Sequence, residues 1–265
     1  MTAPAHPLPH LLSAWSRVGR RIADAPRIAL FLDFDGTLVP YAPRPDLVCV
    51  APATRRILQR LARNPRVRLS IISGRRRADL VQYIGLPRVQ YLGAYGWENG
   101  ARTKISRADR AALAEAKRAL RPLLSTYFTG ATSAWLEDKR FLLAIHYERA
   151  APSARRLLNA ALHTIAKSSR GRLRVLENWE DSELLPRKFR DKGHAVRSES
   201  NHGSPRGTLP VFFGDNISDE SAFTALRRGI TVRVGRTRRP TRAHYKLRSP
   251  AEVTTALAKI DEELR

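Results

Sequence analysis

Two aspartates stand at the end of an apolar run in the stretch IALFLDFDGTLVPY, residues 28–41. Asp33 closes the run, and Asp35 follows it directly before Gly36 and Thr37. Unpaired carboxylates that lie close together repel one another and resist ionisation, whereas a hard cation such as Mg²⁺ neutralises them and accepts their oxygens as ligands. The stretch therefore predicts metal-assisted chemistry where a buried strand ends.

Three further polar residues are placed to join these aspartates. Asp215 ends the apolar run PVFFGD, Ser73 ends RVRLSIISG, and Lys192 lies at the start of the helix predicted from DKGHAV. Ligands of a parallel α/β sheet bind beyond the carboxyl ends of its strands, so Asp33 and Asp215 are expected to face one crevice. Carboxylates, a hydroxyl and an ammonium group gathered there are suited to phosphoryl transfer.

The elements that must position these residues alternate between strand and helix, which is typical of a parallel sheet with helices on its faces. Strands are predicted at 28–33, 66–74, 89–96, 209–215 and 229–235, and helices at 11–22, 53–62, 78–85, 191–196, 219–228 and 249–264. The segment 198–209 is predicted to be a surface loop.

The middle of the chain has a different pattern. It contains predicted helices at 107–124 and 153–168, a hairpin within 133–148, and strands within 173–186. This pattern predicts an α+β domain at 103–185, inserted between two parts of a Rossmann-like core at 1–102 and 186–265.

The composition limits the remaining possibilities. Lys and Arg number 48 against 24 Asp and Glu, a formal net charge of +24, but the basic clusters at 74–79, 226–230 and 235–242 lack interleaved aromatic residues. A solvated basic surface is therefore favoured over nucleic-acid binding. Because there is one cysteine, and no window approaches about 18 uninterrupted apolar residues, we expect a cytoplasmic protein without a membrane span.

Four short motifs occur in a recognisable order. DFDGT, SGR, DKG and GDNISD resemble the motifs of the haloacid dehalogenase superfamily, whose phosphatases use Mg²⁺. The resemblance implies that Asp33 takes the phosphoryl group as an aspartyl phosphate and that Asp35 is the general acid and base. It also implies phosphate contacts from Thr37, Ser73, Gly74 and Lys192, and a metal site formed by Asp33, the backbone carbonyl of Asp35, Asp215 and Asp219.

Longer stretches from residue 30 onward resemble trehalose-6-phosphate phosphatases: LFLDFDGTLVP, GAYGWENG, WLEDKRFLLAIHYE, SELLPRKFRDKGHAV, VFFGDNISDESAFTAL and YKLRSPAEV. The resemblance implies hydrolysis of trehalose 6-phosphate, a small-molecule substrate. It assigns substrate contacts to Glu137, Lys139 and Glu183 in the insert, and to Arg75 in SGR. A carboxylate suits sugar hydroxyls because its two oxygens accept hydrogen bonds from both members of a vicinal pair.

Other interpretations stay open. The chain has Tyr95 where the family usually has a histidine, Asn216 where it often has an acid, and Leu185 where it usually has an arginine. Another disaccharide phosphate or a glycosyl-phosphoglycerate is an alternative substrate. A phosphomutase is a weaker alternative for the enzyme activity, and a polyanion-binding protein is the alternative without catalysis. From the residues alone, D-x-D-G-T can be a turn, GDNISDE a capped helix start, and EDK ordinary hairpin-turn chemistry.

Overall fold

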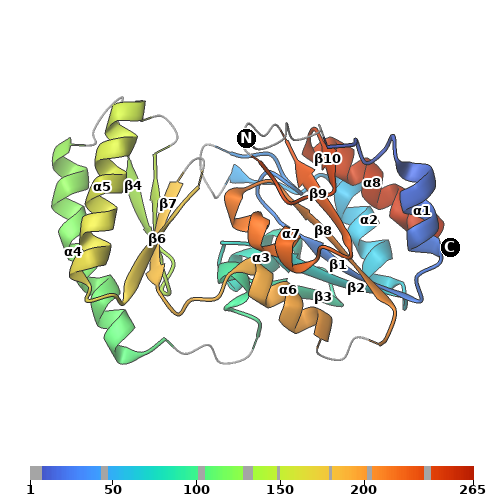
Figure 1. Ribbon diagram of the computed structural model, residues 1–265, viewed down its shortest axis with the longest axis horizontal. Helices are drawn as coiled ribbons and strands as arrows, with labels where there is room; N and C mark the ends of the chain where they lie inside the picture. Colours follow the sequence, from blue (N-terminus) through green and yellow to red (C-terminus); the bar gives the residue numbers. More distant parts are fainter. Residues whose placement is uncertain are drawn as a thin grey trace, which may run out of the picture. The chain divides into compact units, whose positions relative to one another are not determined.

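The computed structural model describes residues 8–42, 47–100, 105–127, 134–147, 150–178, 181–201, 205–235 and 240–265 (Figure 1). The chain divides into two compact units. The first, Met1–Ala101 with Arg190–Arg265, is called the core unit here, and the second, Arg102–Phe189, is called the insert unit.

The core unit contains a six-stranded sheet in the order β10-β9-β8-β1-β2-β3, and every neighbouring pair is parallel. Most residues of its strands are apolar, as expected of a sheet with both faces covered. They are β1 (Arg27–Leu32), β2 (Val67–Ile72), β3 (Val89–Leu92), β8 (Thr208–Gly214), β9 (Ile230–Val234) and β10 (Tyr245–Leu247).

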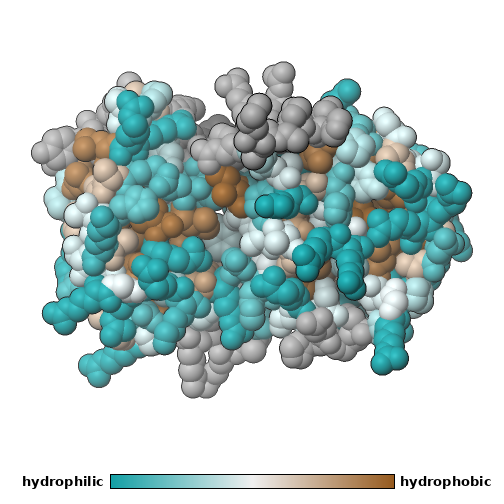
Figure 2. All heavy atoms as spheres, in the orientation of Figure 1, coloured by the Kyte–Doolittle hydropathy of each residue, from teal (hydrophilic) through white to brown (hydrophobic). Residues whose placement is uncertain are grey.

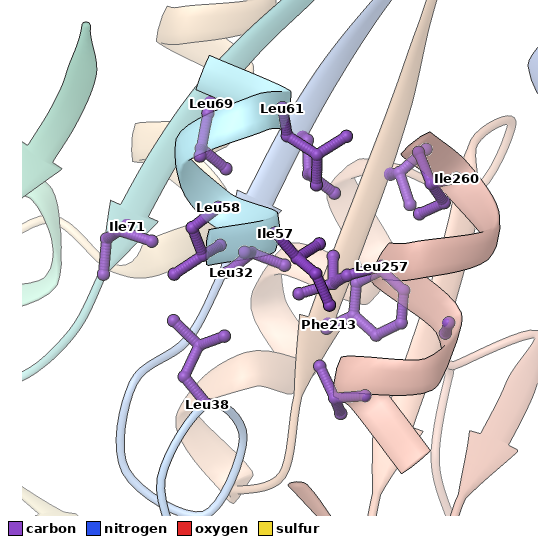
Figure 3. Close-up of a cluster of buried hydrophobic side chains, with 14 of the residues drawn as sticks. Leu32, Leu38, Ile57, Leu58, Leu61, Leu69, Ile71, Phe213, Leu257 and Ile260 are labelled. Atoms are coloured by element: carbon purple, nitrogen blue, oxygen red, sulfur yellow. The ribbon is translucent and has the colours of Figure 1, made fainter. Parts of the chain in front are cut away.

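Helices cover both faces of this sheet. One face packs against α1 (Trp15–Ala23), α2 (Pro52–Arg63), α3 (Arg77–Ile84) and α8 (Pro250–Glu263), and the other against α6 (Lys192–Asn201) and α7 (Glu220–Ala225). Figure 3 shows the first of these layers, where Leu58 of α2 lies over the sheet near Leu32, and Ile57 of α2 lies beside Leu257 of α8. Truncating a fully buried leucine such as Leu58 to alanine costs about 2–5 kcal/mol.

Local signals in the sequence explain where several helices begin and end. Pro52 and Pro250 occupy the first positions of α2 and α8, where a missing N–H costs nothing. The Ser249 side chain caps α8 by accepting the backbone N–H of Glu252. Gly85 ends α3 in the left-handed conformation, with φ 54°.

The insert unit contains an antiparallel four-stranded sheet in the order β4-β5-β7-β6. One face of this sheet packs against two helices, and Leu143, Ile145 and Leu184 of the sheet share a core with Leu120 and Leu158 of the helices (Figure 1). The elements are α4 (Arg107–Tyr127), β4 (Trp135–Asp138), β5 (Leu143–His146), α5 (Pro152–Ser168), β6 (Leu173–Glu177) and β7 (Asp181–Pro186).

The structure confirms the predicted fold class, but some predicted elements are wrong. The helix predicted at 219–228 is the shorter α7, preceded by a 3₁₀ turn at Ile217–Asp219, because the chain already turns toward β9 after Leu226. Strand β10 is absent from the prediction because three residues, Tyr245–Leu247, carry too little pattern. The loop predicted at 198–209 is shorter, because α6 continues to Asn201 and β8 begins at Thr208; residues 202–204 lie outside the described residues.

The two ends of the insert unit compare differently with the prediction. The predicted start at 103 falls outside the described residues. The unit ends at Phe189 rather than 185. The reason is that β7 continues to Pro186, and the backbone N–H of Arg187 then donates to the carbonyl of Arg172 at 2.7 Å, which keeps these residues attached to the insert sheet.

Candidate active site

The carboxylates of Asp33 and Asp215 lie at the same edge of the core sheet because β1 and β8 are parallel neighbours. Leu32, the last residue of β1, pairs with Phe213 of β8. The backbone N–H of Asp33 donates to the carbonyl of Phe213 at 3.0 Å. The strand order reverses between β1 and β8, and open α/β sheets bind their ligands at this kind of switch point.

Three buried aspartates form a cluster at this edge. One carboxylate oxygen from each of Asp33, Asp215 and Asp219 lies within 4.8 Å of the others. The turn after β1 returns toward the cluster at Gly36, whose φ is +73°. A side chain at Gly36 would collide with the Asp215 carboxylate, so the close approach requires glycine.

Among the described residues, the ammonium group that contacts these aspartates is that of Lys192, the first residue of α6. Its Nζ lies 2.9 Å from Asp33 Oδ1 and 2.6 Å from Asp219 Oδ1, and the side chain is 2% exposed. Burial alone lowers the pKa of Lys192, but the charges of Asp219 and Asp33 outweigh it and raise the pKa above its usual value. Lys192 is therefore a fixed positive charge beside Asp33.

The aspartates have raised pKa values. Burial is the main reason that the pKa of Asp33 lies well above its usual value, and Asp219 and Asp215 raise it further against the lowering effect of Lys192. Burial, together with the charge of Asp219, raises the pKa of Asp215 to about 6. Three carboxylates with one ammonium leave an excess of negative charge that water cannot solvate.

This donor set fits a hard divalent cation. Asp215 Oδ1 accepts the Thr37 hydroxyl at 3.2 Å, and Oδ2 accepts the Tyr41 hydroxyl at 2.7 Å. A carboxylate offers about four lone-pair sites, so Asp215 can still bind a cation, as can the Asp33 carboxylate. A cation bound by these oxygens would also remove the repulsion that raises their pKa values.

Asp219 is engaged differently from the other two aspartates. Its Oδ1 accepts from Lys192, and its Oδ2 accepts the backbone N–H groups of Asp215 at 3.0 Å and Asn216 at 2.8 Å. The chain around it also requires Gly214, where a Cβ would collide with the Asp219 carboxyl group. Asp219 thus holds Lys192 and the turn after β8, and its predicted place in the metal site stays a prediction.

Asp35 forms an ion pair with Arg75. Arg75 Nε donates to Asp35 Oδ2 and Nη2 donates to Oδ1, each at 2.7 Å. The guanidinium also lies over the rings of Phe34 and Tyr83, at 5.3 and 5.2 Å from their centroids. The structure thus pairs Arg75 with the predicted acid and base, and its assignment to the substrate stays a prediction.

The predicted phosphate-binding residues come from the same region of the core unit. Besides Thr37, which donates to Asp215, they include Ser73, directly after β2, whose hydroxyl oxygen accepts the backbone N–H of Arg75 at 3.1 Å. Gly74 lies against a ring, since a Cβ there would be 2.8 Å from the Tyr95 hydroxyl oxygen. Whether Thr37, Ser73 and Gly74 contact phosphate stays a prediction.

Two tyrosines at the site were not predicted as site residues. Tyr41 donates to Asp215 and accepts from Asn216 Nδ2 at 3.1 Å, although its place six residues after Asp35 carries no sequence signal. Tyr95, noted only as a departure from the family pattern, has a positive φ of 59°, and its ring centroid lies 5.9 Å from Lys192 Nζ. For Tyr95, its departure from the family pattern was the sequence signal that could have indicated a site residue.

The insert unit gathers the other predicted residues on one face of its sheet. Glu137 of β4 and Glu183 of β7 both pair with Ala144 of β5, so the two carboxylates project from the same face. Lys139 Nζ lies 3.0 Å from Glu183 Oε1 and 3.8 Å from Glu137 Oε2. Burial lowers the pKa of Lys139, but Glu183 and Glu137 outweigh it and raise the pKa.

Comparisons with known proteins now identify the family. The family model for trehalose-phosphatase matches residues 31–251. The chain belongs to the trehalose-phosphatase family. The trehalose-phosphate phosphatase of Mycobacterium tuberculosis is 34% identical over 97% of this chain and 67% of its own length. That of Mycobacterium leprae is 33% identical over 89% of this chain and 58% of its own length.

Solved structures agree with this trehalose-phosphatase fold. The C-terminal domain of the C. albicans trehalose-6-phosphate phosphatase superposes with a TM-score of 0.81, at 21% identity over 98% of this chain and 99% of that one. The sucrose-phosphatase of Synechocystis, solved with sucrose and phosphate, gives a TM-score of 0.54 at 18% identity over 89% of this chain and 98% of that one. At these identities the two structures support the fold alone.

The composition predicts a cytoplasmic protein with a solvated basic surface and without a membrane span. Among the described residues, no helix has the length and apolarity needed to cross a membrane. Of the basic clusters, Arg75 is paired with Asp35 and Arg76 lies 3.6 Å from Asp79, while 236–239 lie outside the described residues. The cytoplasmic location and the preference against nucleic acid stay predictions.

Proposed function

We propose that this chain hydrolyses trehalose 6-phosphate to trehalose and inorganic phosphate, with Mg²⁺ as cofactor. The observation that carries the proposal is the position of Lys192 Nζ, within hydrogen-bonding distance of both Asp33 and Asp219 in a cluster completed by Asp215. A nucleophilic carboxylate beside a fixed ammonium is what transfer of a highly charged phosphoryl group requires. Membership of the trehalose-phosphatase family supplies the substrate.

In the first step, an oxygen of Asp33 attacks phosphorus and forms a new O–P bond while the ester bond to the sugar oxygen breaks. Protonated Asp35 gives its proton to the departing sugar oxygen, so that trehalose leaves as a neutral alcohol. Lys192 stays charged throughout, because its raised pKa holds the proton, and it balances the charge on the phosphoryl oxygens.

In the second step, water attacks the phosphorus of the aspartyl phosphate. Asp35, now a carboxylate, takes a proton from the water as the bond between Asp33 and phosphorus breaks, which releases phosphate and regenerates both carboxyl groups. The two hydrogen bonds from Arg75 hold Asp35 in one orientation for both proton transfers.

Asp33, Asp215 and the backbone carbonyl of Asp35 would hold the Mg²⁺. When bound, the ion neutralises the clustered carboxylates and polarises the phosphoryl oxygens. Asp219 contributes by holding Lys192 and the turn that carries Asp215. Three of its roughly four lone-pair sites accept these donors, so we propose that holding Lys192 and this turn is its main role, ahead of direct ligation.

The experiment that tests the proposal is phosphate release from a panel of monoesters with and without Mg²⁺. Trehalose 6-phosphate is expected to give the highest kcat/KM, above sucrose 6-phosphate, a glucosyl-phosphoglycerate, glucose 6-phosphate and p-nitrophenyl phosphate. If the protein released no phosphate from trehalose 6-phosphate but rapidly hydrolysed another sugar phosphate, the proposed substrate would be wrong, and the proposed phosphatase mechanism would still hold. No Mg²⁺-dependent release from any monoester, with steeply salt-dependent nucleic-acid binding, would favour the polyanion-binding alternative.

A further inference from the structure

An aromatic pair lies next to the carboxylates of the insert unit. The indole of Trp135 stacks on the imidazole of His146, with centroids 4.0 Å apart and ring planes 15° from parallel. The two residues are direct partners in the β4-β5 register. Trp135 is nevertheless 43% exposed, so the stacked indole still presents surface to solvent.

The position of the indole is tightly determined. His146 Nε2 lies 2.9 Å from Glu137 Oε2, which anchors the imidazole on which the indole stacks. Trp135 and Glu137 alternate with Leu136, which packs into the core beneath α4 and α5, so both project from the opposite face. The indole is thus fixed by a stack, a hydrogen-bonded histidine and the strand pairing, which lowers the entropy lost when a ligand binds.

The surroundings of the indole favour a sugar as its ligand. Residues two apart on a strand are separated by about 6.8 Å, so the indole and Glu137 can contact adjoining parts of one ligand. The same face carries Glu183 and the ammonium of Lys139, which suit hydroxyl groups. A pyranose presents hydroxyl edges together with a C–H face, and an aromatic surface beside hydrogen-bonding groups complements both.

We propose that the indole of Trp135 is a stacking surface for one sugar ring of the phosphorylated disaccharide. The proposal rests on the proposed function and adds a specificity-determining residue to it. The carboxylates and Lys139 bind hydroxyls, and the indole covers the apolar face of a ring. A monoester without a sugar cannot use this surface, so Trp135 contributes to discrimination between substrates.

The test compares Trp135→Ala, Trp135→Phe and the control Leu157→Ala. Leu157 is also an exposed apolar residue, 54% exposed, but it lies on α5, which packs on the other face of the sheet. For Trp135→Ala, the fall in kcat/KM for trehalose 6-phosphate is expected to exceed the fall for p-nitrophenyl phosphate by about tenfold, whereas Trp135→Phe keeps most of the preference. Leu157→Ala is expected to leave kcat/KM unchanged for both substrates. Equal falls for both substrates in Trp135→Ala would overturn the proposal.

A double-mutant cycle separates direct stacking from support of Glu137 through His146. If the indole contacts the sugar, Trp135→Ala still lowers kcat/KM for trehalose 6-phosphate in a Glu137→Gln background. No further loss in that background would overturn direct stacking. A thermal melt of each variant shows whether it folds. If Trp135→Ala does not fold, Trp135→Leu, which keeps an apolar side chain without an aromatic ring, replaces it in the same measurements.

Binding of unphosphorylated trehalose to the full chain, measured by calorimetry, is independent of turnover. Wild-type binding that weakens about tenfold in Trp135→Ala supports the stacking surface even if trehalose 6-phosphate is not hydrolysed, in which case only the proposed function fails. No binding of trehalose to the wild-type chain, or equal binding by wild type and Trp135→Ala, would overturn the stacking surface.

Discussion

Arg75 and Asp35 are joined by two parallel hydrogen bonds of 2.7 Å, one to each carboxylate oxygen. This fork holds the predicted acid and base in a single orientation, and the rings of Phe34 and Tyr83 support the guanidinium. An ammonium group has no planar fork, so lysine cannot replace arginine in this arrangement.

We therefore expect Arg75→Lys to lower kcat by about 10- to 100-fold through misplacement of Asp35. A series of aryl phosphates with different leaving-group pKa values tests this without involving sugar contacts. The loss is expected to grow as the leaving group becomes a poorer one, because only a poor leaving group needs the proton from Asp35. A uniform loss across the series would contradict the positioning role.

Asp33→Asn is expected to abolish turnover, with a loss of more than about 1,000-fold, because the amide keeps the shape but cannot act as an anionic nucleophile. The fold is expected to survive, since the substitution removes a buried charge. Phosphate release and thermal melts measure the two effects. Near-normal turnover in this variant would eliminate the aspartyl-phosphate mechanism.

The metal-free protein is expected to lose stability as the pH rises. The pKa of Asp215 is about 6 in the folded chain against an ordinary value of 3.8, so the folded state holds this proton more tightly than the unfolded state does. The stabilisation from the proton is complete below the lower value and is lost as the pH passes the higher one. Thermal melts in chelator should show Tm falling as the pH rises from 3.8 to about 6. In the control Asp215→Asn, this fall in Tm with pH should be smaller.

Added Mg²⁺ should reverse that loss and raise Tm more above pH 6 than below it, because protons and the cation compete for the same oxygens. Activity should disappear in chelator. Full activity in excess chelator, or a Tm shift that is independent of pH, would argue against a cation bound by Asp33 and Asp215.

Tyr41→Phe tests the hydroxyl that contacts Asp215. The variant removes the 2.7 Å hydrogen bond to Oδ2 and the acceptor of the Asn216 amide, and it leaves the ring in place. Loss of one hydrogen bond to a charged group corresponds to about 1.5–3 kcal/mol, so we expect about a tenfold or greater change in Mg²⁺ affinity by calorimetry. An unchanged affinity would mean that the hydroxyl does not position Asp215.

Removing one member of the buried pair of Lys139 and Glu183 should lower the free energy of unfolding strongly, whereas replacing both with apolar residues should lower it much less. Glu183→Gln leaves the ammonium of a 7% exposed lysine without its nearest charge partner, at an expected cost of about 3–5 kcal/mol in the free energy of unfolding. The double variant Lys139→Met with Glu183→Leu is expected to recover most of that loss.

Urea denaturation measures these differences, with Lys117→Met as the control. Lys117 and Asp138 form a 2.6 Å pair in the same unit, but both side chains are substantially exposed. Breaking an exposed pair costs about 1 kcal/mol or less. Similar losses from Glu183→Gln and Lys117→Met would show that burial does not govern the energy of the Lys139 pair.

The sequence by itself determined the core strands and the residues that end them. A run such as IALFL has no polar face, so it predicts a strand buried on both sides, and Asp33 and Asp215 then fall at the carboxyl ends of two such strands. Parallel neighbours place their ends at one edge, and this regularity is why the aspartate cluster could be anticipated before any contact was known.

The tertiary structure decided which partner each charged side chain has. That Arg75 pairs with Asp35, that Lys192 pairs with Asp219, and that Tyr41 donates to Asp215 all depend on contacts between residues far apart in the chain. Trp135 stacks on His146 because two strands pair in one particular register. Periodicity reports which face of an element is buried, but a hydrogen bond depends on distances of a few tenths of an ångström, which only the packed chain sets.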